Sequence, residues 1–392
     1  MVGASLALLL REQIESGLSV ALIDAHAATP VNLLQPSFDA RTTALSLGSK
    51  RIFEQLGQWQ GLQHHACAIK HIQVSQKKQL GRIRLHAQDS QVEALGFVLE
   101  NRVLGQQLWQ SLIELDGLTV LAPAKVESYK MDKHGAQLIL NKDGEQIELC
   151  CELLVLADGA NSEGCAQLGI TQKRFDYEQS ALVCNVTFDQ PHKNWAYERF
   201  TLDGPLALLP MSNNRFGLVW CMDAEQATET LDLNEADFKA ALQKILGYKM
   251  GRLQRIGERQ TYPLSLVQAQ EQVRSHVVVS GNAAHGLHPV AGQGFNLALR
   301  DCVALAQQIK QSSKENLGCL SVLNKYLSTV ENDQLMTTAI SHGLPISFTQ
   351  KGTGFSLLRA IGMTVMDSSP VIKKLFAKQA MGLLGATELW RP

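Results

Sequence analysis

The stretch Val277–Asp301 constrains the fold of this chain more than any other part of the sequence. It begins with three consecutive valines, and a run of β-branched residues without polar alternation is typical of a strand in a sheet covered on both faces. Gly281 allows a sharp turn after this strand, and Gly292 and Gly294 leave a loop without side chains before a helix expected from Asn296. Free N–H groups at the start of such a helix attract negative charge, so the sequence predicts an anion-binding strand–loop–helix unit.

The same stretch resembles the second FAD-binding motif of the aromatic hydroxylase superfamily, the flavoprotein monooxygenases related to p-hydroxybenzoate hydroxylase. The usual form of that motif is G-D-A-A-H-x-x-x-P-x-x-G-Q-G-x-N. The matching residues are Gly281, Asn282, Ala283, Ala284, His285, Pro289, Gly292, Gln293, Gly294 and Asn296. Asn282 stands where most members have Asp, and its side-chain oxygen can accept the same hydrogen bond from a ribitol hydroxyl. An ordinary glycine-rich turn between a strand and a helix is the alternative.

The first 24 residues resemble the second half of a dinucleotide-binding fingerprint. A helix is expected from the first turn, and residues 18–24 are expected to form a short strand that ends in Asp24, which would hold a ribose hydroxyl. The acid of such a fingerprint follows the glycines by ~20 residues, which fits if Gly3 is the last glycine. We therefore expect the first strand and first two glycines to be missing, through a start site assigned late or a truncated, catalytically weakened chain. An unrelated helix followed by a chance acid is the third possibility.

Three further elements resemble those of the ubiquinone-biosynthesis hydroxylases within this superfamily. Arg41, in a segment similar to F-D-x-R-x-x-A-L-S, would reach over the flavin diphosphate or ring, and Arg102 would begin a helix against the adenosine side. Asp158 and Gly159 match the D-G motif that serves FAD and the nicotinamide cofactor, although Cys165 stands near where members often have Arg. A solvated loop arginine, a plain helix start and a generic strand-end turn are the respective alternatives.

The fold class implied by this resemblance is α/β, with a discontinuous Rossmann-like FAD/NAD(P)-binding domain at 1–63, 97–170 and 260–325. A small antiparallel meander within it is expected from strands at 119–121, 136–140 and 147–150. Strand-like runs predict an antiparallel β-sheet substrate domain at 64–96 and 171–259. A helical region at 326–392 mixes apolar residues with Lys and Arg, and would either rest on a membrane or partner, or cover the domain with a solvated basic side.

Composition excludes several classes of function. Lys and Arg number 36 against 37 Asp and Glu, which gives no reason to expect nucleic-acid binding. No uninterrupted apolar run approaches the roughly 18 residues that a membrane span needs, so we expect a cytoplasmic protein that can lie peripheral to the inner membrane. The eight cysteines never form C-x-x-C, which favours reduced thiols and predicts no metal site.

The resemblance covers nearly the whole chain and implies a 2-polyprenyl-6-methoxyphenol hydroxylase. NADPH or NADH would reduce FAD, dioxygen would form the flavin C4a-hydroperoxide, and one oxygen atom would pass to a prenylated phenol. N–H groups of Gly292, Gln293 and Gly294 would stabilise negative charge on the reduced flavin, and Pro289 would form a wall beside the ring. His285 and His288 are expected to shape the turn rather than transfer protons.

Three alternatives to this function stay open. The first is a sister ubiquinone hydroxylase that attacks another ring carbon, since such enzymes share almost all of these residues. The second is a flavin-free structural subunit of an assembly of ubiquinone-biosynthesis proteins, which would purify colourless. The third is a flavin reductase or dehydrogenase acting on a prenyl chain, which would not consume oxygen.

Overall fold

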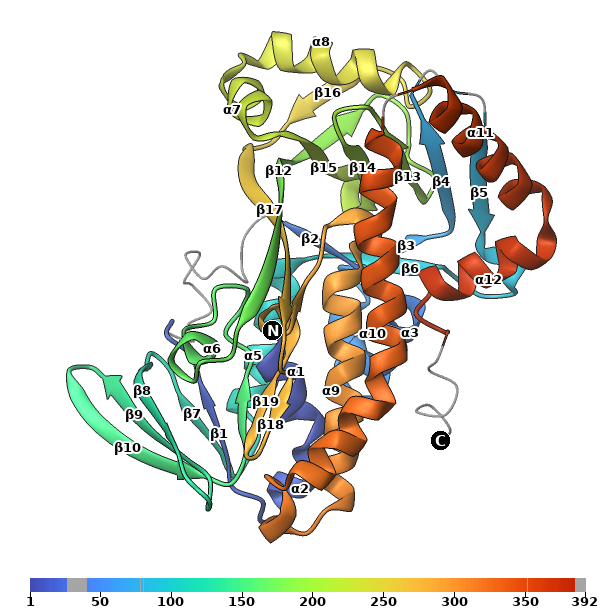
Figure 1. The fold of residues 1–392 in the computed structure, drawn as a ribbon. Helices are drawn as coiled ribbons and strands as arrows, with labels where there is room; N and C mark the ends of the chain where they lie inside the picture. Colours follow the sequence, from blue (N-terminus) through green and yellow to red (C-terminus); the bar gives the residue numbers. More distant parts are fainter. Residues whose placement is uncertain (27–40, 78, 80, 351, 385–392) are drawn as a thin grey trace.

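The computed structural model of the chain describes residues 1–26, 41–77, 79, 81–350 and 352–384. Residues 37–40 of the predicted Arg41 element lie outside these ranges. An α/β part, a large, mostly antiparallel sheet and a group of long helices are arranged around one another (Figure 1). Among the described residues, no helix is both long and apolar enough to cross a membrane.

Two parallel strand pairs form the centre of the α/β part. They are β1 (Val20–Ile23) with β7 (Leu118–Leu121), and β11 (Leu154–Leu156) with β19 (Val277–Val279). As expected, the three valines of β19 are fully buried, and a helix, α1 (Val2–Leu9), precedes β1. The predicted Rossmann-like fold is thus confirmed in this part of the molecule.

Helix α1 lies between the two strand pairs. A Cβ added to Gly3 would lie 3.3 Å from Leu22 Cδ1 at the end of β1 and 3.9 Å from Ala157 Cβ just after β11. The helix therefore lies in van der Waals contact with both strand ends at this glycine.

The predicted meander is wrong in one strand. Residues 119–121 belong to β7, which lies parallel to β1, whereas the meander consists of β8 (Lys125–Met131), β9 (Ala136–Lys142) and β10 (Glu145–Cys151). The β8 strand was missed because its sequence, KVESYKM, has few apolar residues and only partly buried or exposed positions.

The large sheet has the strand order β20-β17-β12-β15-β14-β13-β4-β5, with β16 paired to β12. The predicted antiparallel sheet is confirmed except at one pair, because β13 lies parallel to β4. The sheet continues past residue 259, since β17 pairs with β12. The strands are β4 (His71–Gln76), β5 (Arg82–His86), β12 (Gln172–Phe188), β13 (Trp195–Phe200), β14 (Pro205–Met211), β15 (Arg215–Asp223), β16 (Leu253–Ile256), β17 (Gln260–Ala269) and β20 (His285–Gly286).

The two faces of this sheet differ in what covers them. One face packs against α7 (Ala224–Asp232) and α8 (Glu235–Leu246), with Leu206, Trp220 and Phe238 in the shared core. Because side chains alternate along a strand, the intervening residues point to the opposite face. That face forms a wall of the cavity described below.

Long helices complete the molecule, as the sequence predicted. They are α9 (Gln293–Gln311), α10 (Leu320–Thr349), α11 (Thr353–Ser368) and α12 (Pro370–Ala380). An ion pair joins α9 to α10, with Arg300 Nε 2.6 Å from Asp333 Oδ2. Helix α11 packs beside β5, and α12 turns back toward α10 and α3 (Figure 1), where the Gln379 amide donates to the Thr337 hydroxyl.

Shorter elements connect these parts. Helices α2 (Arg11–Glu15), α3 (Leu47–Gln55), α4 (Trp59–Leu62), α5 (Asn101–Ile113) and α6 (Glu163–Gln167) belong to the α/β part. A three-stranded sheet of β2 (Thr42–Ser46), β6 (Gly96–Glu100) and β3 (Cys67–Ile69) joins that part to the large sheet, and β18 (Val273–Arg274) borders β19.

Candidate functional site

A continuous cavity of about 1700 Å³ runs between the α/β part, the open face of the large sheet and the long helices. Pockets for one small ligand usually measure ~300–1,000 Å³. Part of this larger volume lies between β1 and β11, lined by Leu18, Leu154 and Leu317, and the rest borders the start of α9 and the open face of the large sheet. Eleven of the predicted site residues line it: Gly3, Asp24, Arg41, Asp158, Gly159, Asn282, Pro289, Gly292, Gln293, Gly294 and Asn296.

Helix α9 begins inside this cavity, three residues earlier than the sequence predicted. Its N-cap, Gly292, has a φ of +59°, and a Cβ there would also lie 3.3 Å from Ala44 Cβ. At Gly294 an added Cβ would meet no protein atom within 4 Å. The N–H groups of the first turn therefore border open space and can donate to a ligand oxygen.

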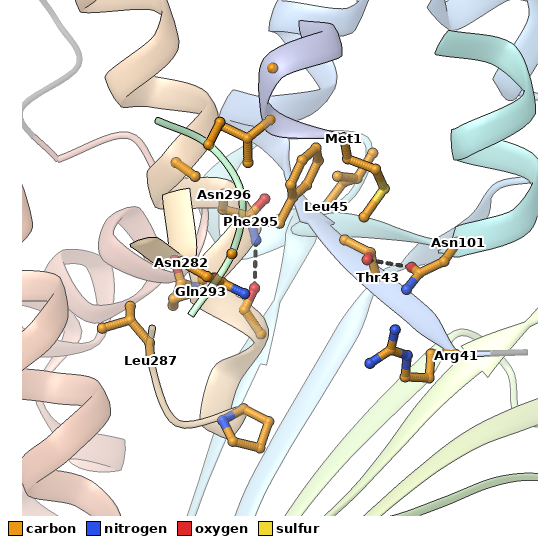
Figure 2. Close-up of a pocket in the computed structure, with 18 of the residues that line it drawn as sticks. Met1, Arg41, Thr43, Leu45, Asn101, Asn282, Leu287, Gln293, Phe295 and Asn296 are labelled. Atoms are coloured by element: carbon orange, nitrogen blue, oxygen red, sulfur yellow. Dashed lines mark hydrogen bonds between the residues drawn. The ribbon is translucent and has the colours of Figure 1, made fainter. Parts of the chain in front are cut away.

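Asn296 fixes the start of α9 against the strand β2. Its Oδ1 accepts hydrogen bonds from the Ser46 N–H (2.8 Å) and the Ser49 hydroxyl (2.7 Å). Its Nδ2 donates to the carbonyls of Ala44 (2.8 Å) and Gly292 (2.7 Å), and the second of these bonds is drawn in Figure 2. The amide is thus fully used within the protein, so Asn296 shapes the site through these contacts.

The turn after β19 places the predicted motif residues at different depths. Gly281 has a φ of +64°, and a Cβ there would be 3.0 Å from Val2 Cγ2, so this glycine lets α1 approach. Asn282 lines the cavity (Figure 2). Ala283 is fully buried, and neither it nor Gly281 lines the cavity. The roles predicted for these residues in cofactor binding remain predictions.

Two acids lie at the ends of strands from the two parallel pairs. Asp24 follows β1, and its Oδ1 accepts a hydrogen bond of 2.9 Å from the His26 N–H. Asp158 follows β11 and accepts one of 3.2 Å from the Gly164 N–H. Gly159 has a φ of +94°, and a Cβ there would meet no protein atom within 4 Å. Both acids border the cavity with room beside them for hydroxyl groups.

The two predicted arginines lie in different surroundings. The Arg41 guanidinium stacks over the Tyr262 ring, 4.6 Å from its centroid, and faces the cavity (Figure 2). Arg102 is about half exposed, does not line the cavity, and lies 3.7 Å from Glu100 Oε2. Its neighbour Asn101 lines the cavity instead and accepts a 2.6 Å hydrogen bond from the Thr43 hydroxyl. The predicted role of Arg102 at the adenosine side remains a prediction.

The two histidines of the motif are buried. His285 Nε2 donates to Asp301 Oδ2 at 2.6 Å, and the same oxygen accepts from the Gln334 amide at 2.9 Å. His288 accepts from the Val290 N–H, and burial followed by the neighbouring His342 lowers its pKa to about 4. His288 is therefore neutral at pH 7, and both rings make hydrogen bonds within the protein. That they shape the turn rather than transfer protons stays a prediction.

Sequence reasoning missed Glu198, which lies on β13 and lines the cavity. Burial raises the pKa of this carboxyl to about 8. The available signal was a lone acid in an aromatic strand, Trp-Ala-Tyr-Glu-Arg-Phe, at a position that alternation places on the open face of the sheet.

The residues around the start of α9 fit a dinucleotide cofactor of the FAD type. Gly159 and Gly294 both leave space where any larger side chain would intrude. The helix start supplies N–H donors, and the strand-end acids supply acceptors for sugar hydroxyls. The described fold and site together define a flavin-binding oxidoreductase in which one cavity serves both cofactor and substrate.

The chain belongs to the FAD binding domain family, which matches residues 1–326. It is 33% identical to the ubiquinone hydroxylase UbiL of Rhodospirillum rubrum, over 98% of this chain and 88% of that protein. It is 28% identical to the 3-demethoxyubiquinol 3-hydroxylase of Escherichia coli, over 98% of this chain and 96% of that one. The predictions of FAD as cofactor and of a flavoprotein monooxygenase are confirmed.

Solved structures show the same fold at lower identity. The p-nitrophenol 4-monooxygenase PnpA of Pseudomonas putida superposes with a TM-score of 0.75 at 14% identity, covering 97% of this chain and 95% of that one. PqsL of Pseudomonas aeruginosa, described as a probable FAD-dependent monooxygenase, gives 0.74 at 21% identity, covering 93% and 96%. Both likenesses extend over the α/β part, the sheet and the helices.

Proposed function

We propose that this chain hydroxylates the aromatic ring of a polyprenyl phenol in ubiquinone biosynthesis, with 2-polyprenyl-6-methoxyphenol as the substrate. FAD would be the cofactor, NADPH or NADH the reductant, and dioxygen the source of the added atom. The observation that supports this substrate class is the apolar extension of the cavity beyond the start of α9. Relatives named as ubiquinone hydroxylases support the same class of reaction.

The apolar extension is lined from two sides. The sheet contributes Ile72, Val74, Ile83 and Leu85, and the helices contribute Leu344, Phe348, Met363, Met366 and Phe376. Each CH₂ group moved from water into such surroundings contributes ~0.8 kcal/mol, so a prenyl chain of several units would bind here strongly. A small polar phenol would gain little binding free energy from an apolar lining of this length.

The positions of the residues suggest separate roles for the cofactor and for the protein. When bound, FAD would take hydride from the nicotinamide cofactor and activate dioxygen. Gly292, Gln293 and Gly294 would stabilise negative charge on the flavin ring through the N–H groups at the start of α9. Asp24 would hold a sugar hydroxyl, Arg41 would face the cofactor, and Pro289 would wall the ring position.

A membrane contact through α11 and α12 is a further part of this proposal. These helices separate the apolar extension from the surface, with Met363 and Phe376 facing the cavity. Their outer side exposes Phe355, Leu357, Leu358, Ile361, Val365, Val371, Ile372 and Leu375. The basic side chains of Lys374 and Lys378 are exposed between them, which fits the headgroups of an anionic bilayer. A prenylated substrate dissolved in the bilayer would then enter next to these helices.

Vesicle sedimentation tests the membrane contact. The protein should sediment with vesicles of phosphatidylcholine and phosphatidylglycerol, and more weakly with phosphatidylcholine alone. Replacing Leu357 and Leu358 by Glu should abolish the stronger sedimentation with vesicles that contain phosphatidylglycerol. Ile113→Glu, which changes an exposed apolar residue on α5, should leave it unchanged. Equal sedimentation of all three proteins would contradict the proposal.

The reaction itself is tested with purified, FAD-loaded protein and 2-geranyl-6-methoxyphenol under ¹⁸O₂. We expect NADPH or NADH oxidation that depends on the phenol, and a product with one ¹⁸O atom, whose position by NMR identifies the ring carbon. A protein that stays colourless with added FAD would instead be a structural subunit. Turnover without oxygen consumption would indicate a reductase or dehydrogenase.

A further inference from the structure

Glu198 occupies an unusual place for a carboxyl group. It lies in the middle of β13, on the same face as Ala196 and Phe200, and all three line the cavity. Its neighbours across the sheet are Val74 on β4 and Ala207 on β14. The open face of the sheet is therefore apolar around this single acid.

The carboxyl group of Glu198 has no hydrogen-bond or ion-pair partner among the residues that the structure describes. Buried acids are normally paired, since an unpaired polar group in apolar surroundings is destabilising. An acceptor left without a partner inside a ligand cavity is available to the ligand.

Glu198 also lies next to the loop that leads into α9. A second, small cavity of about 10 Å³ is lined by Glu198 together with Ala207, Cys221, Pro289 and Val290. The carboxyl thus borders the proline that is proposed to wall the ring position. An aromatic ring placed against Pro289 from the side of the sheet would come within reach of this acid.

We propose that Glu198 binds the phenolic hydroxyl of the substrate and accepts its proton, which activates the ring for hydroxylation. This inference rests on the proposed function. The phenol O–H bond breaks, its electron pair stays on the oxygen as a phenolate, and the proton forms an O–H bond with the carboxylate. The phenolate pushes electron density onto the ring carbon that receives oxygen. Glu198 returns its proton to solvent when the product leaves.

The environment of Glu198 suits this exchange. Burial raises the pKa of the carboxyl to about 8, which approaches the pKa of ~10 for a phenol. Proton transfer from the phenol to the carboxylate is easier when the two pKa values are closer. The titratable or charged groups on the surrounding walls include Tyr197 on β13, Cys184 on β12, Cys221 on β15, Glu258 before β17, Tyr262 on β17, His288 on the loop, Arg41 before β2 and Arg359 on α11. Burial raises the pKa of Cys221 above its ordinary value as well, so this thiol is neutral beside Glu198.

The test compares the wild-type protein with Glu198→Gln, which keeps size and polarity but cannot accept the proton. Glu229→Gln, the same change at an exposed position on α7, is the matched control. With FAD-loaded protein and 2-geranyl-6-methoxyphenol, Glu198→Gln should lower kcat by ~100-fold or more, as expected for a lost general base. The dissociation constant for the phenol, followed by the flavin spectrum, should change only a few-fold.

The pH dependence of kcat/KM separates a catalytic from a structural role of Glu198, because a purely structural role would leave it unchanged. In the wild type and the control, kcat/KM should rise with pH through about 8, the value to which burial raises the pKa of Glu198, and this limb should be missing in Glu198→Gln. A full-rate Glu198→Gln enzyme, or an unchanged pH limb, would overturn the inference while leaving the hydroxylase proposal intact. A wild-type protein that hydroxylates no prenylated phenol would overturn the proposed function and this inference with it.

Discussion

Replacing Glu198 by Gln should stabilise the fold, and the gain should depend on pH. Burial raises the pKa of this carboxyl from 4.5 to about 8, so the folded state holds its proton over a range in which the unfolded state has lost it. Folding stability therefore falls as the pH rises from 4.5 to about 8. Gln does not titrate, so the variant escapes this loss.

The magnitude follows from the same two values. At 1.36 kcal/mol per pH unit, a rise from 4.5 to about 8 corresponds to at most about 5 kcal/mol. Water in the cavity screens the carboxylate, which reduces the expected full cost to about 2–3 kcal/mol. Between pH 6 and pH 9 the advantage of the variant should grow by about 1–2 kcal/mol.

The assay is urea unfolding followed by tryptophan fluorescence, at saturating FAD and at several pH values. Excess FAD keeps the contribution of cofactor binding equal in the compared proteins. Glu229→Gln should track the wild type throughout. If the difference between Glu198→Gln and the wild type stayed constant from pH 6 to pH 9, the carboxyl would not be held protonated by its surroundings, and the reasoning would be refuted.

Three other perturbations have defined outcomes. Gly294→Val places a side chain in open cavity space, so the protein should fold normally. Its affinity for FAD, measured by quenching of flavin fluorescence, should be ~10- to 100-fold weaker. Unchanged affinity would exclude this part of the cavity as the flavin site. Asp301→Ala removes the acceptor of the buried His285 N–H and should lower the free energy of unfolding by about 2–4 kcal/mol, measured by urea titration; a loss below about 0.5 kcal/mol would contradict the importance of this bond. Burial lowers the pKa of His288 to about 4 from 6.5, so stability should fall as the pH drops through this window, and His288→Gln should flatten that dependence in thermal melts; an equal slope in both proteins would argue against it.

The local motifs of the site could be predicted from the sequence because their geometry is local. The segment from Gly281 to Asn296 specifies its own turn, loop and helix start through glycines and one proline. Asp24 and Asp158 follow short apolar strands of two separate parallel pairs, and both line the cavity.

What the sequence could not give depends on pairing between distant segments. The partner of β7 is β1, 98 positions earlier in the register of Val20 with Leu118, so its parallel neighbour was not visible locally. At the start of α5, Asn101 rather than Arg102 lines the cavity, because one residue of helical rotation decides which side chain faces inward. Glu198 became a candidate only when the register of β13 placed it against Val74 and Ala207.

The hydrogen bond from the Ser46 N–H to Asn296 has a consequence for how the protein is made. Its two residues are 250 positions apart, and every strand of the large sheet lies in the chain between them. At a synthesis rate of ~5–20 residues per second, Ser46 leaves the ribosome roughly 10–50 s before its partner. Cofactor uptake should therefore be a late event in biogenesis, and nascent chains halted before α9 should emerge without flavin.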